Sequence, residues 1–452
     1  MTVRLIDSLA TTEPLAKLFS DESLLGAMLE FEVALARAEA RCGVIPKKVA
    51  EAIAASADVN HFDISAFAHA TFRAGTPAIP LVKRLTEQVR KRNGEAARFV
   101  HWGATSQDVA DSAMSLLLTR AAPILNSDLS KLERALAELS NRHKQSVMLG
   151  RTLLQAAPPV TFGLKAAGWL ASVRRGGESL RNAFGDAAVL QFGGASGTLA
   201  SLGSKGNAVA AALAKELKLK LPEAPWHTHR DRWATLICAC GVLTGSLAKM
   251  ARDVSLLMQN EVEEAAEPGG AGRGGSSTMP HKRNPIACSL TLAAAHRLPG
   301  LVSSYLSAMV QEHERGVGGW QAEWPIISST IQLTGVAMVS MAEVAEGLVA
   351  SPKNMRANIE KTNGVIFAER AMMLLGSKLG RDAAHKILEA ATRKCISENR
   401  QLAEVLAGIP EVARHLDRSS LQELQVPEKY LGSAEDFRRA LLSGSAMLKR
   451  KP

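Results

Sequence analysis

Leucine positions in the middle of the chain follow a helical period. Leu125, Leu129, Leu132, Leu136 and Leu139 are three or four residues apart, which places them on one face of an α-helix. Similar long patterns cover residues 161–186, 230–264, 285–312 and 322–350. Several of these segments are apolar on more than one face, so each needs packing partners on several sides. The pattern therefore predicts an all-α protein built around a bundle of long helices that other subunits complete.

Shorter helical segments flank this bundle on both sides. Residues 21–43 form an amphipathic pattern rich in Ala and Glu, and pieces punctuated by Pro and Gly follow to about residue 98. Beyond residue 351 the helices shorten and the density of charged residues rises. We therefore expect three domains: an N-terminal helical domain at residues 1–107, a central bundle at 108–350 and a C-terminal helical domain at 351–452.

The composition suits helix packing and limits the classes of partner. Of the 452 residues, 46% are hydrophobic but only 4% are aromatic, and Ala and Leu are the main apolar residues. This composition suits closely packed helices better than a sheet-based core. The formal net charge is +10, yet the basic residues are scattered among acidic ones without interleaved aromatics. We therefore expect no nucleic-acid partner, and an anionic small substrate or plain solubility accounts for the charge.

Three features bear on the location of the protein in the cell. Residues 324–342 are uncharged and nearly long enough to span a bilayer, but Pro325, Gln332 and several hydroxyl residues favour a buried bundle helix. The five cysteines are an odd number and mostly far apart, as expected of reduced thiols. The first residues lack an apolar leader segment. We expect a cytoplasmic protein with no membrane partner.

The segment with the most chemical information is a loop that follows several glycines. Residues 275–285 read Gly-Ser-Ser-Thr-Met-Pro-His-Lys-Arg-Asn-Pro. Glycines allow such a loop to open and close over a ligand, and Ser276 is a hydroxyl that can give up or accept a proton. Lys282 brings a positive charge, and Asn284 before a proline is a helix-start signal. Because helix N-termini attract anions, the segment favours an enzyme that builds negative charge on a carboxylate substrate.

Other interpretations of the glycines and histidines fit the sequence less well. Residues 270–275 match the Gly-x-Gly-x-x-Gly dinucleotide pattern, but the preceding segment 230–264 is helical in pattern rather than a strand. A flexible linker would explain the glycines but not the dense motif that follows them. The spacing of His227, His229 and His281 fits no strong zinc pattern. We expect no metal and no organic cofactor.

The loop at residues 275–285 resembles the signature loop of the fumarase/aspartase superfamily. Two further blocks agree in type and order: residues 101–108, His-Trp-Gly-Ala-Thr-Ser-Gln-Asp, and residues 150–155, which contain Gly-Arg-Thr and Gln155. This resemblance implies a three-domain helical homotetramer with a long central bundle and active sites assembled from three subunits. It also implies catalytic roles for Ser276, Lys282 and Asn284, and contacts with a polycarboxylate substrate for His101, Thr105, Ser106, Gln107, Thr152 and Arg315.

Within the superfamily, the chain is most similar to the bacterial 3-carboxy-cis,cis-muconate cycloisomerases of protocatechuate breakdown, part of the beta-ketoadipate pathway of aromatic catabolism. The supporting segments are residues 78–83, 191–198, 225–232 and 311–324. This similarity implies an isomerase that closes a lactone, with Ser276 as the proton carrier. Adenylosuccinate lyase is the nearest rival. Trp320 and Trp324 replace residues that bind a phosphate in that enzyme, although Trp320 is equally well explained as a packing residue.

One position separates these two chemistries. Fumarases and adenylosuccinate lyases carry a histidine directly after the Gly-Arg-Thr block, whereas this chain has Leu153, and a second histidine is replaced by Ala156. Without an imidazole, a site cannot readily protonate an amine or activate water, but a carboxylate nucleophile is already ionised. Leu153 therefore favours the cycloisomerase. A fumarate-releasing lyase is the alternative, and a helical scaffold without activity is the third hypothesis.

Overall fold

The structure, a computed structural model, describes residues 5–269, 274–275, 279 and 282–444. The chain forms two compact units, each made of three segments. Unit 1 contains Met1–Ser130, Arg175–Ala248 and Leu290–Ser340, and unit 2 contains Lys131–Arg174, Lys249–Ser289 and Met341–Pro452. Helices dominate both units, so the predicted all-α fold class is confirmed.

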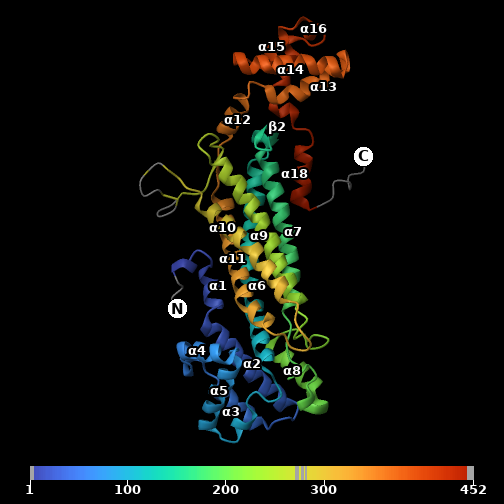
Figure 1. Cartoon of the computed structure of the whole chain (residues 1–452). Helices are drawn as coiled ribbons and strands as arrows, with labels where there is room; N and C mark the ends of the chain where they lie inside the picture. The colour runs from blue at the N-terminus through green and yellow to red at the C-terminus, as the bar shows by residue number, and fades with distance from the viewer. Residues whose placement is uncertain (1–4, 270–273, 276–278, 280–281, 445–452) are drawn as a thin grey trace. The chain divides into compact units, whose positions relative to one another are not determined.

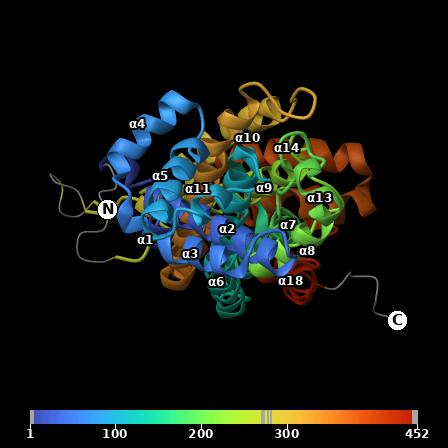
Figure 2. The ribbon, with the colours of Figure 1, turned by 90° about the horizontal axis from the view of Figure 1, so that it is seen from below.

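The N-terminal part of unit 1 is a cluster of shorter helices around α2, drawn in blue in Figure 1. Its elements are η1 (Leu5–Asp7), α1 (Glu13–Leu18), α2 (Asp21–Arg41), α3 (Lys47–Ser56), η2 (Val59–His61), α4 (Ile64–Ala74), α5 (Ala78–Arg92) and η3 (Ala96–Phe99). The hydroxyl of Ser20 accepts a hydrogen bond from the amide of Ser23 and caps α2, which matches the helix predicted at residues 21–43. In both views α4 lies beside α5 (Figures 1 and 2).

The same unit contains a segment from later in the chain that packs on α2. This segment is η4 (Ala200–Lys205) followed by α8 (Gly206–Leu217), and α8 lies beside α2. Apolar side chains from α2, α3, α5 and α8 form one core, in which Met28, Leu81 and Leu213 are fully buried. The core fixes α2, and α2 carries acidic side chains that matter for the site below.

Five long helices follow the pattern predicted for the bundle. They are α6 (Ser106–Arg142), α7 (Phe162–Ala187), α9 (Asp231–Leu257), α10 (Ile286–Ala308) and α11 (Gly319–Gly347). Each contributes residues to both units. The five leucines that were predicted to share one face of α6 are each at most 1% exposed. The helical periodicity of this segment is therefore confirmed.

Several boundaries differ from those predicted. The prediction continued α9 to residue 264, but the helix ends at Leu257, and by Glu264 the chain is entering a strand, with the carbonyl of Glu264 accepting a hydrogen bond from the amide of Ser351. Likewise α10 ends at Ala308 rather than at residue 312, and α11 begins at Gly319 rather than at residue 322. The backbone pairing of Glu264 with the distant Ser351 is a contact that helical periodicity does not reveal.

Unit 2 contains two small sheets that the sequence pattern did not predict. Strand β1 (Val147–Thr152) pairs antiparallel with β2 (Gln155–Thr161), and β3 (Ala265–Ala266) pairs with β4 (Val349–Ala350). The C-terminal helices, in orange and red in Figure 1, are α12 (Pro352–Glu360), η5 (Val365–Phe367), α13 (Ala368–Leu379), α14 (Arg381–Glu398), α15 (Leu402–Ala407), α16 (Pro410–Ala413), α17 (Arg418–Leu424), η6 (Pro427–Tyr430) and α18 (Ala434–Ser443).

Three of the long helices, α9, α10 and α11, have the length and composition of a membrane span. In α11, 72% of the most apolar window is buried inside the structure, which agrees with the predicted bundle helix. In α10 only 28% of that window is buried, so this helix leaves an apolar surface uncovered. All five cysteines are free thiols.

Candidate active site

The block at residues 101–108 forms a tight segment that leads into α6. His101 and Gly103 both have left-handed backbone conformations, with φ of 60° and 72°. The imidazole of His101 is turned toward α2, where its Nδ1 lies 2.6 Å from Oε1 of the buried Glu32. Sequence reasoning selected His101 but missed Glu32. The signal was present, since Glu32 lies among the apolar residues of the amphipathic α2 pattern.

A second buried acid lies on α2 beyond this pair. Glu39 is 0% exposed, and neither of its carboxylate oxygens has a hydrogen-bond partner among the described residues. Burial, with a further contribution from the charge of Glu32, raises the pKa of Glu39 to about 9. Glu39 is therefore a protonated, neutral acid near neutral pH. Burial acts to lower the pKa of His101, but the adjoining Glu32 carboxylate outweighs it, so that pKa is raised.

The structure brings together Thr105 and Arg315, two of the predicted substrate contacts. The guanidinium Nη1 of Arg315 donates a hydrogen bond of 2.8 Å to the hydroxyl of Thr105. Burial lowers the pKa of Arg315, and the nearby carboxylates of Asp108 and Asp111 oppose that shift. Since an arginine stays protonated even after such a shift, the pair presents a cation and a hydroxyl side by side.

Asp108 fixes the geometry of this segment. Its carboxylate accepts hydrogen bonds from the backbone amides of Thr105, Gly193 and Gly194 at 2.9–3.0 Å and lies 2.9 Å from Nε2 of His227. The side chain is 0% exposed, so these four contacts take up its oxygens inside the protein. His227, which the sequence raised as a metal candidate, is thereby placed as a partner of Asp108.

Two other predicted substrate contacts, Ser106 and Gln107, differ in how exposed they are. Ser106 is the first residue of α6 and is partly exposed. Gln107 is 1% exposed, and its amide nitrogen donates to the carboxylate of Asp111 and to the carbonyl of His227. The nitrogen of Gln107 is thus engaged inside the protein.

Behind this segment lies a buried ionic network. The guanidinium of Arg230 donates to the carboxylates of Asp111 and Glu323, and it lies 4.5 Å and 4.7 Å from the ring centres of Trp226 and Trp233. Burial opposes the charge of Arg230, but the two carboxylates raise its pKa above the ordinary value. The network therefore holds an arginine permanently charged within the unit 1 core.

The indole of Trp320 joins this network. It is 5% exposed, and its Nε1 donates a 2.9 Å hydrogen bond to Asp111. Of the two interpretations that the sequence left open, packing and ligand contact, the structure supports packing for this residue. Its partner in an edge-to-face aromatic pair is Trp324, with ring centres 4.8 Å apart.

The signature loop belongs to unit 2, where the structure describes only part of it. Ser276, the predicted proton carrier, lies outside the described residues. Lys282 is exposed, and Asn284 is partly exposed, with its backbone amide donating to the carbonyl of Gly274 at 2.9 Å. This bond joins two described residues on either side of the loop. Gly274 has a φ of +66°, and a Cβ there would lie 3.0 Å from the carbonyl oxygen of Asn284.

The helix that follows the loop is capped by a residue that sequence reasoning missed. The prediction placed Asn284 as the cap of α10, but the helix begins at Ile286, and the carboxylate of Glu267 accepts the amides of Ala287 and Cys288 at 3.1 Å and 2.8 Å. A carboxylate at a helix N-terminus also compensates the helix dipole. Glu267 is 6% exposed, so the predicted anion site at this N-terminus is filled by a side chain of the protein itself.

The block at residues 150–155 forms a hairpin with an apolar tip in unit 2. Thr152, a predicted substrate contact, ends β1 and pairs with Gln155. Leu153 and Leu154 form the two-residue turn, with φ of 50° and 64° and with 97% and 76% of their surfaces exposed. Left-handed conformations are unfavourable for leucine, so this turn is both strained and apolar.

An ion pair to a buried carboxylate holds this hairpin close to its tip. Arg151 forms two 2.8 Å hydrogen bonds to the carboxylate of Glu264, which is 0% exposed. The amide of Asn358 on α12 also donates to Glu264, at 2.9 Å. The Gly-Arg-Thr arginine therefore has a structural partner within unit 2.

Known protein families and individual enzymes match most of this chain. Residues 9–300 match the protein family described as Lyase, and residues 364–440 match the family described as Adenylosuccinate lyase C-terminus. The 3-carboxy-cis,cis-muconate cycloisomerase of Bradyrhizobium diazoefficiens is 48% identical over 92% of this chain and 92% of its own length. The enzyme of the same name from Pseudomonas aeruginosa is 46% identical over 98% of this chain and 97% of its own length.

A solved structure of a similar enzyme also matches this chain over almost its whole length. The crystal structure of the 3-carboxy-cis,cis-muconate lactonizing enzyme from Pseudomonas putida has a TM-score of 0.92 and 42% identity, and the match covers 98% of each chain. The chain belongs to the lyase family. This lyase is thus a member of the fumarase/aspartase superfamily, as the signature loop predicted.

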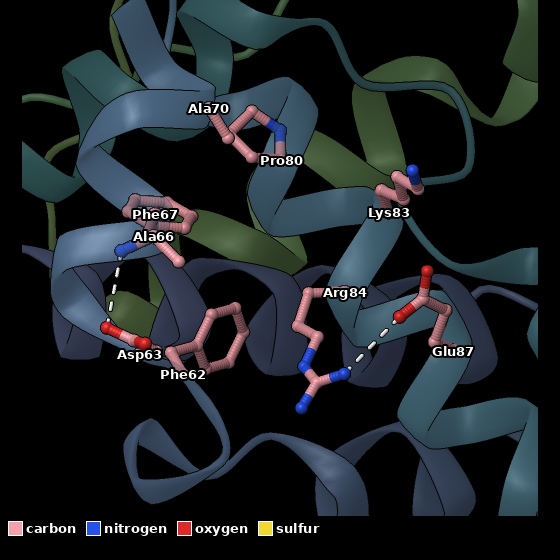
Figure 3. Close-up of a pocket in the computed structure, with 9 residues that line it drawn as sticks. All are labelled: Phe62, Asp63, Ala66, Phe67, Ala70, Pro80, Lys83, Arg84 and Glu87. Atoms are coloured by element: carbon pink, nitrogen blue, oxygen red, sulfur yellow. Dashed lines mark hydrogen bonds and ion pairs between the residues drawn. The ribbon is translucent and has the colours of Figure 1, made fainter.

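This lyase also contains a pocket away from the predicted residues. The pocket lies between α4 and α5 in unit 1 and has a volume of about 300 Å³ (Figure 3). It is lined by Phe62, Asp63, Ala66, Phe67, Ala70, Pro80, Lys83, Arg84 and Glu87. Arg84 is paired with Glu87, and Asp63 caps α4 (Figure 3). None of the predicted site residues lines this pocket. Among the described residues, no group of three or more His, Cys, Asp or Glu side chains is arranged to hold a metal.

Proposed function

We propose that this lyase is a cycloisomerase that converts 3-carboxy-cis,cis-muconate to 4-carboxymuconolactone in the cytoplasm, within protocatechuate catabolism. In this reaction one substrate carboxylate forms a carbon–oxygen bond to an alkene carbon. A proton is added to the carbon next to another carboxylate, so substrate and product are isomers. The proposal draws on the cycloisomerases that match almost the whole chain at 42–48% identity.

The observation that carries the proposal is the tip of the β1–β2 hairpin. The position where other superfamily members have a histidine is Leu153, which is 97% exposed and has no acid–base group. The neighbouring Leu154 is also apolar. An enzyme that expels an amine or activates water needs a proton donor or acceptor there, whereas an internal carboxylate arrives already ionised.

The proposed roles of the site residues follow from their chemistry. Ser276 delivers the proton, and Lys282 with Asn284 stabilises the negative charge that develops on the substrate carboxylate. His101, Thr105, Ser106, Gln107, Thr152 and Arg315 bind the carboxylates. The hydrogen bond between Arg315 and Thr105 supports this assignment for that pair, because the two groups form a ready-made anion contact. The proposed reaction requires no metal and no organic cofactor.

We further propose a homotetramer with three domains per chain, at residues 1–107, 108–350 and 351–452, and with active sites shared between subunits. An apolar groove of about 690 Å³ supports this assembly; it runs between α9 and α10 and is lined by residues that include Val242, Val302 and Leu306. Val242 is 66% exposed in the single chain, and such a surface requires a partner. Light scattering of the purified protein measures the mass and tests the tetramer.

The direct test is turnover with purified protein. Loss of the ultraviolet absorbance of the conjugated diene on addition to 3-carboxy-cis,cis-muconate is the expected result. Ser276→Ala should abolish this loss while substrate binding persists. Release of fumarate from adenylosuccinate or argininosuccinate, without reaction of the muconate, would instead identify the fumarate-releasing alternative. Binding without turnover of any of these compounds would support a scaffold.

A further inference from the structure

We propose that Glu32 is a positioning residue that keeps the imidazole of His101 doubly protonated, so that its Nε2–H binds a carboxylate of the substrate. This inference rests on the proposed function, because it names a contact within that site. Glu32 itself touches no substrate; it acts through His101.

Glu32 and His101 form a close, largely buried pair. Oε1 of Glu32 lies 2.6 Å from Nδ1 of His101, and the two side chains are 1% and 15% exposed. In the part of the chain that the structure describes, Nε2 of His101 has no hydrogen-bond partner. The buried carboxylate thus fixes one edge of the ring and leaves the other edge available for a ligand.

The backbone that carries the imidazole has an unfavourable conformation. His101 has a φ of +60°, a left-handed conformation that is unfavourable for a residue with a side chain. Strain of this kind persists only where surrounding contacts compensate for it, and among the described residues the imidazole makes its hydrogen bond with Glu32. Four residues later, Thr105 bonds to Arg315. One short segment therefore supplies both a fixed imidazole and a fixed arginine contact.

The charges around His101 favour a protonated imidazole. The ionisable groups that face it are Glu32 from α2 and Asp108 from α6, and Glu39 follows Glu32 along α2. Both facing groups are acidic and favour a charged ring, while burial opposes it. Because Glu39 is held neutral, it adds no charge to this balance. Glu32 is the acid within hydrogen-bond distance, so its charge dominates.

The test measures binding rather than turnover. Glu32→Gln keeps the shape of the side chain and an oxygen for Nδ1–H but removes the charge. The probe is trans-aconitate, an unsaturated tricarboxylate, titrated calorimetrically in two buffers of different ionisation enthalpy. At about pH 8, Glu32→Gln should weaken binding about tenfold and increase the number of protons taken up on binding, because without the carboxylate the imidazole gains its second proton only when the probe binds. At about pH 6 the two affinities should converge.

Matched variants keep the inference falsifiable. Glu39→Gln replaces a neutral buried acid of the same helix and should bind like the parent at both pH values. His101→Gln should weaken binding at both pH values and remove the pH dependence, and this variant serves if Glu32→Gln fails to fold. Equal affinity and equal proton uptake for the parent and Glu32→Gln would overturn the inference. Normal binding behaviour together with no reaction of 3-carboxy-cis,cis-muconate would refute the proposed function alone.

Discussion

Replacing Glu39 with glutamine should change how the stability of the protein depends on pH. The buried carboxyl has a pKa of about 9 in the folded chain, compared with an ordinary value of 4.5. Between these two values the folded state holds one proton that the unfolded state releases. The free energy of unfolding therefore falls as the pH rises from about 4.5 to about 9, at about 1.4 kcal/mol per pH unit.

The size of the effect follows from that slope. At about pH 7, keeping Glu39 buried lowers the free energy of unfolding by about 3 kcal/mol relative to its value at about pH 4.5. Between about pH 5 and about pH 8, the free energy of unfolding falls by about 4 kcal/mol. Glutamine has nearly the same shape and does not titrate. Its amide is also buried without a partner, so the variant still bears the free-energy penalty of burying a polar group. The variant does not bear the pH-dependent loss of stability that the carboxyl causes. Relative to the parent, Glu39→Gln should become progressively more stable with rising pH.

Urea denaturation followed by tryptophan fluorescence, at one fixed subunit concentration, measures this difference. Infrared spectroscopy gives an independent check, because the parent at neutral pH should show the carbonyl stretch of a protonated carboxylic acid that the variant lacks. Parallel stability curves for the two proteins from about pH 5 to about pH 8 would refute the reasoning. They would mean that Glu39 is ionised and paired in the folded protein.

Three further outcomes are expected. Arg315→Met should lower kcat/KM for the proposed substrate by about 100-fold, because a charged hydrogen-bond donor is lost; an unchanged value in steady-state kinetics would remove Arg315 from the site. Glu267→Ala should lower the free energy of unfolding by about 1–2 kcal/mol in urea titrations, since it removes the cap of α10, and Asn284→Ala is the control expected to leave stability nearly unchanged. Gly274→Ala, which forces a side chain into a left-handed turn, should reduce kcat about tenfold while the melting temperature shifts little; normal turnover would show that the turn tolerates a side chain.

The long helices were predictable because their burial leaves a record in the sequence. A helix that packs on its neighbours needs apolar residues at every third or fourth position, and the leucines of α6 show that spacing. The ends of α9 and α10 were not predictable to the residue. The backbone bond between Glu264 and Ser351 and the cap from Glu267 come from residues distant in sequence, and no local pattern encodes them.

The residues of the candidate site were also predictable only in part. The block around Thr105 and the motif with Lys282 could be selected from residue types, since hydroxyls, a lysine and glycines in one short segment have few purely structural explanations. The partners that orient them could not. Glu32 is separated from His101 by 69 positions, and Arg315 from Thr105 by 210, so only the folded chain shows that these groups meet.

The sequence by itself determined the helical class, the family and the absence of an imidazole at Leu153, because each of these depends on residue identity or on short-range spacing. The tertiary structure decided which acids are buried and which charges they support. Glu39 and Glu32 lie on the same helix, α2. Glu39 has no hydrogen-bond partner among the described residues and is protonated, whereas Glu32 contacts His101. The pKa of an acid depends on the solvent and charges around it, and those are fixed only when distant segments pack together.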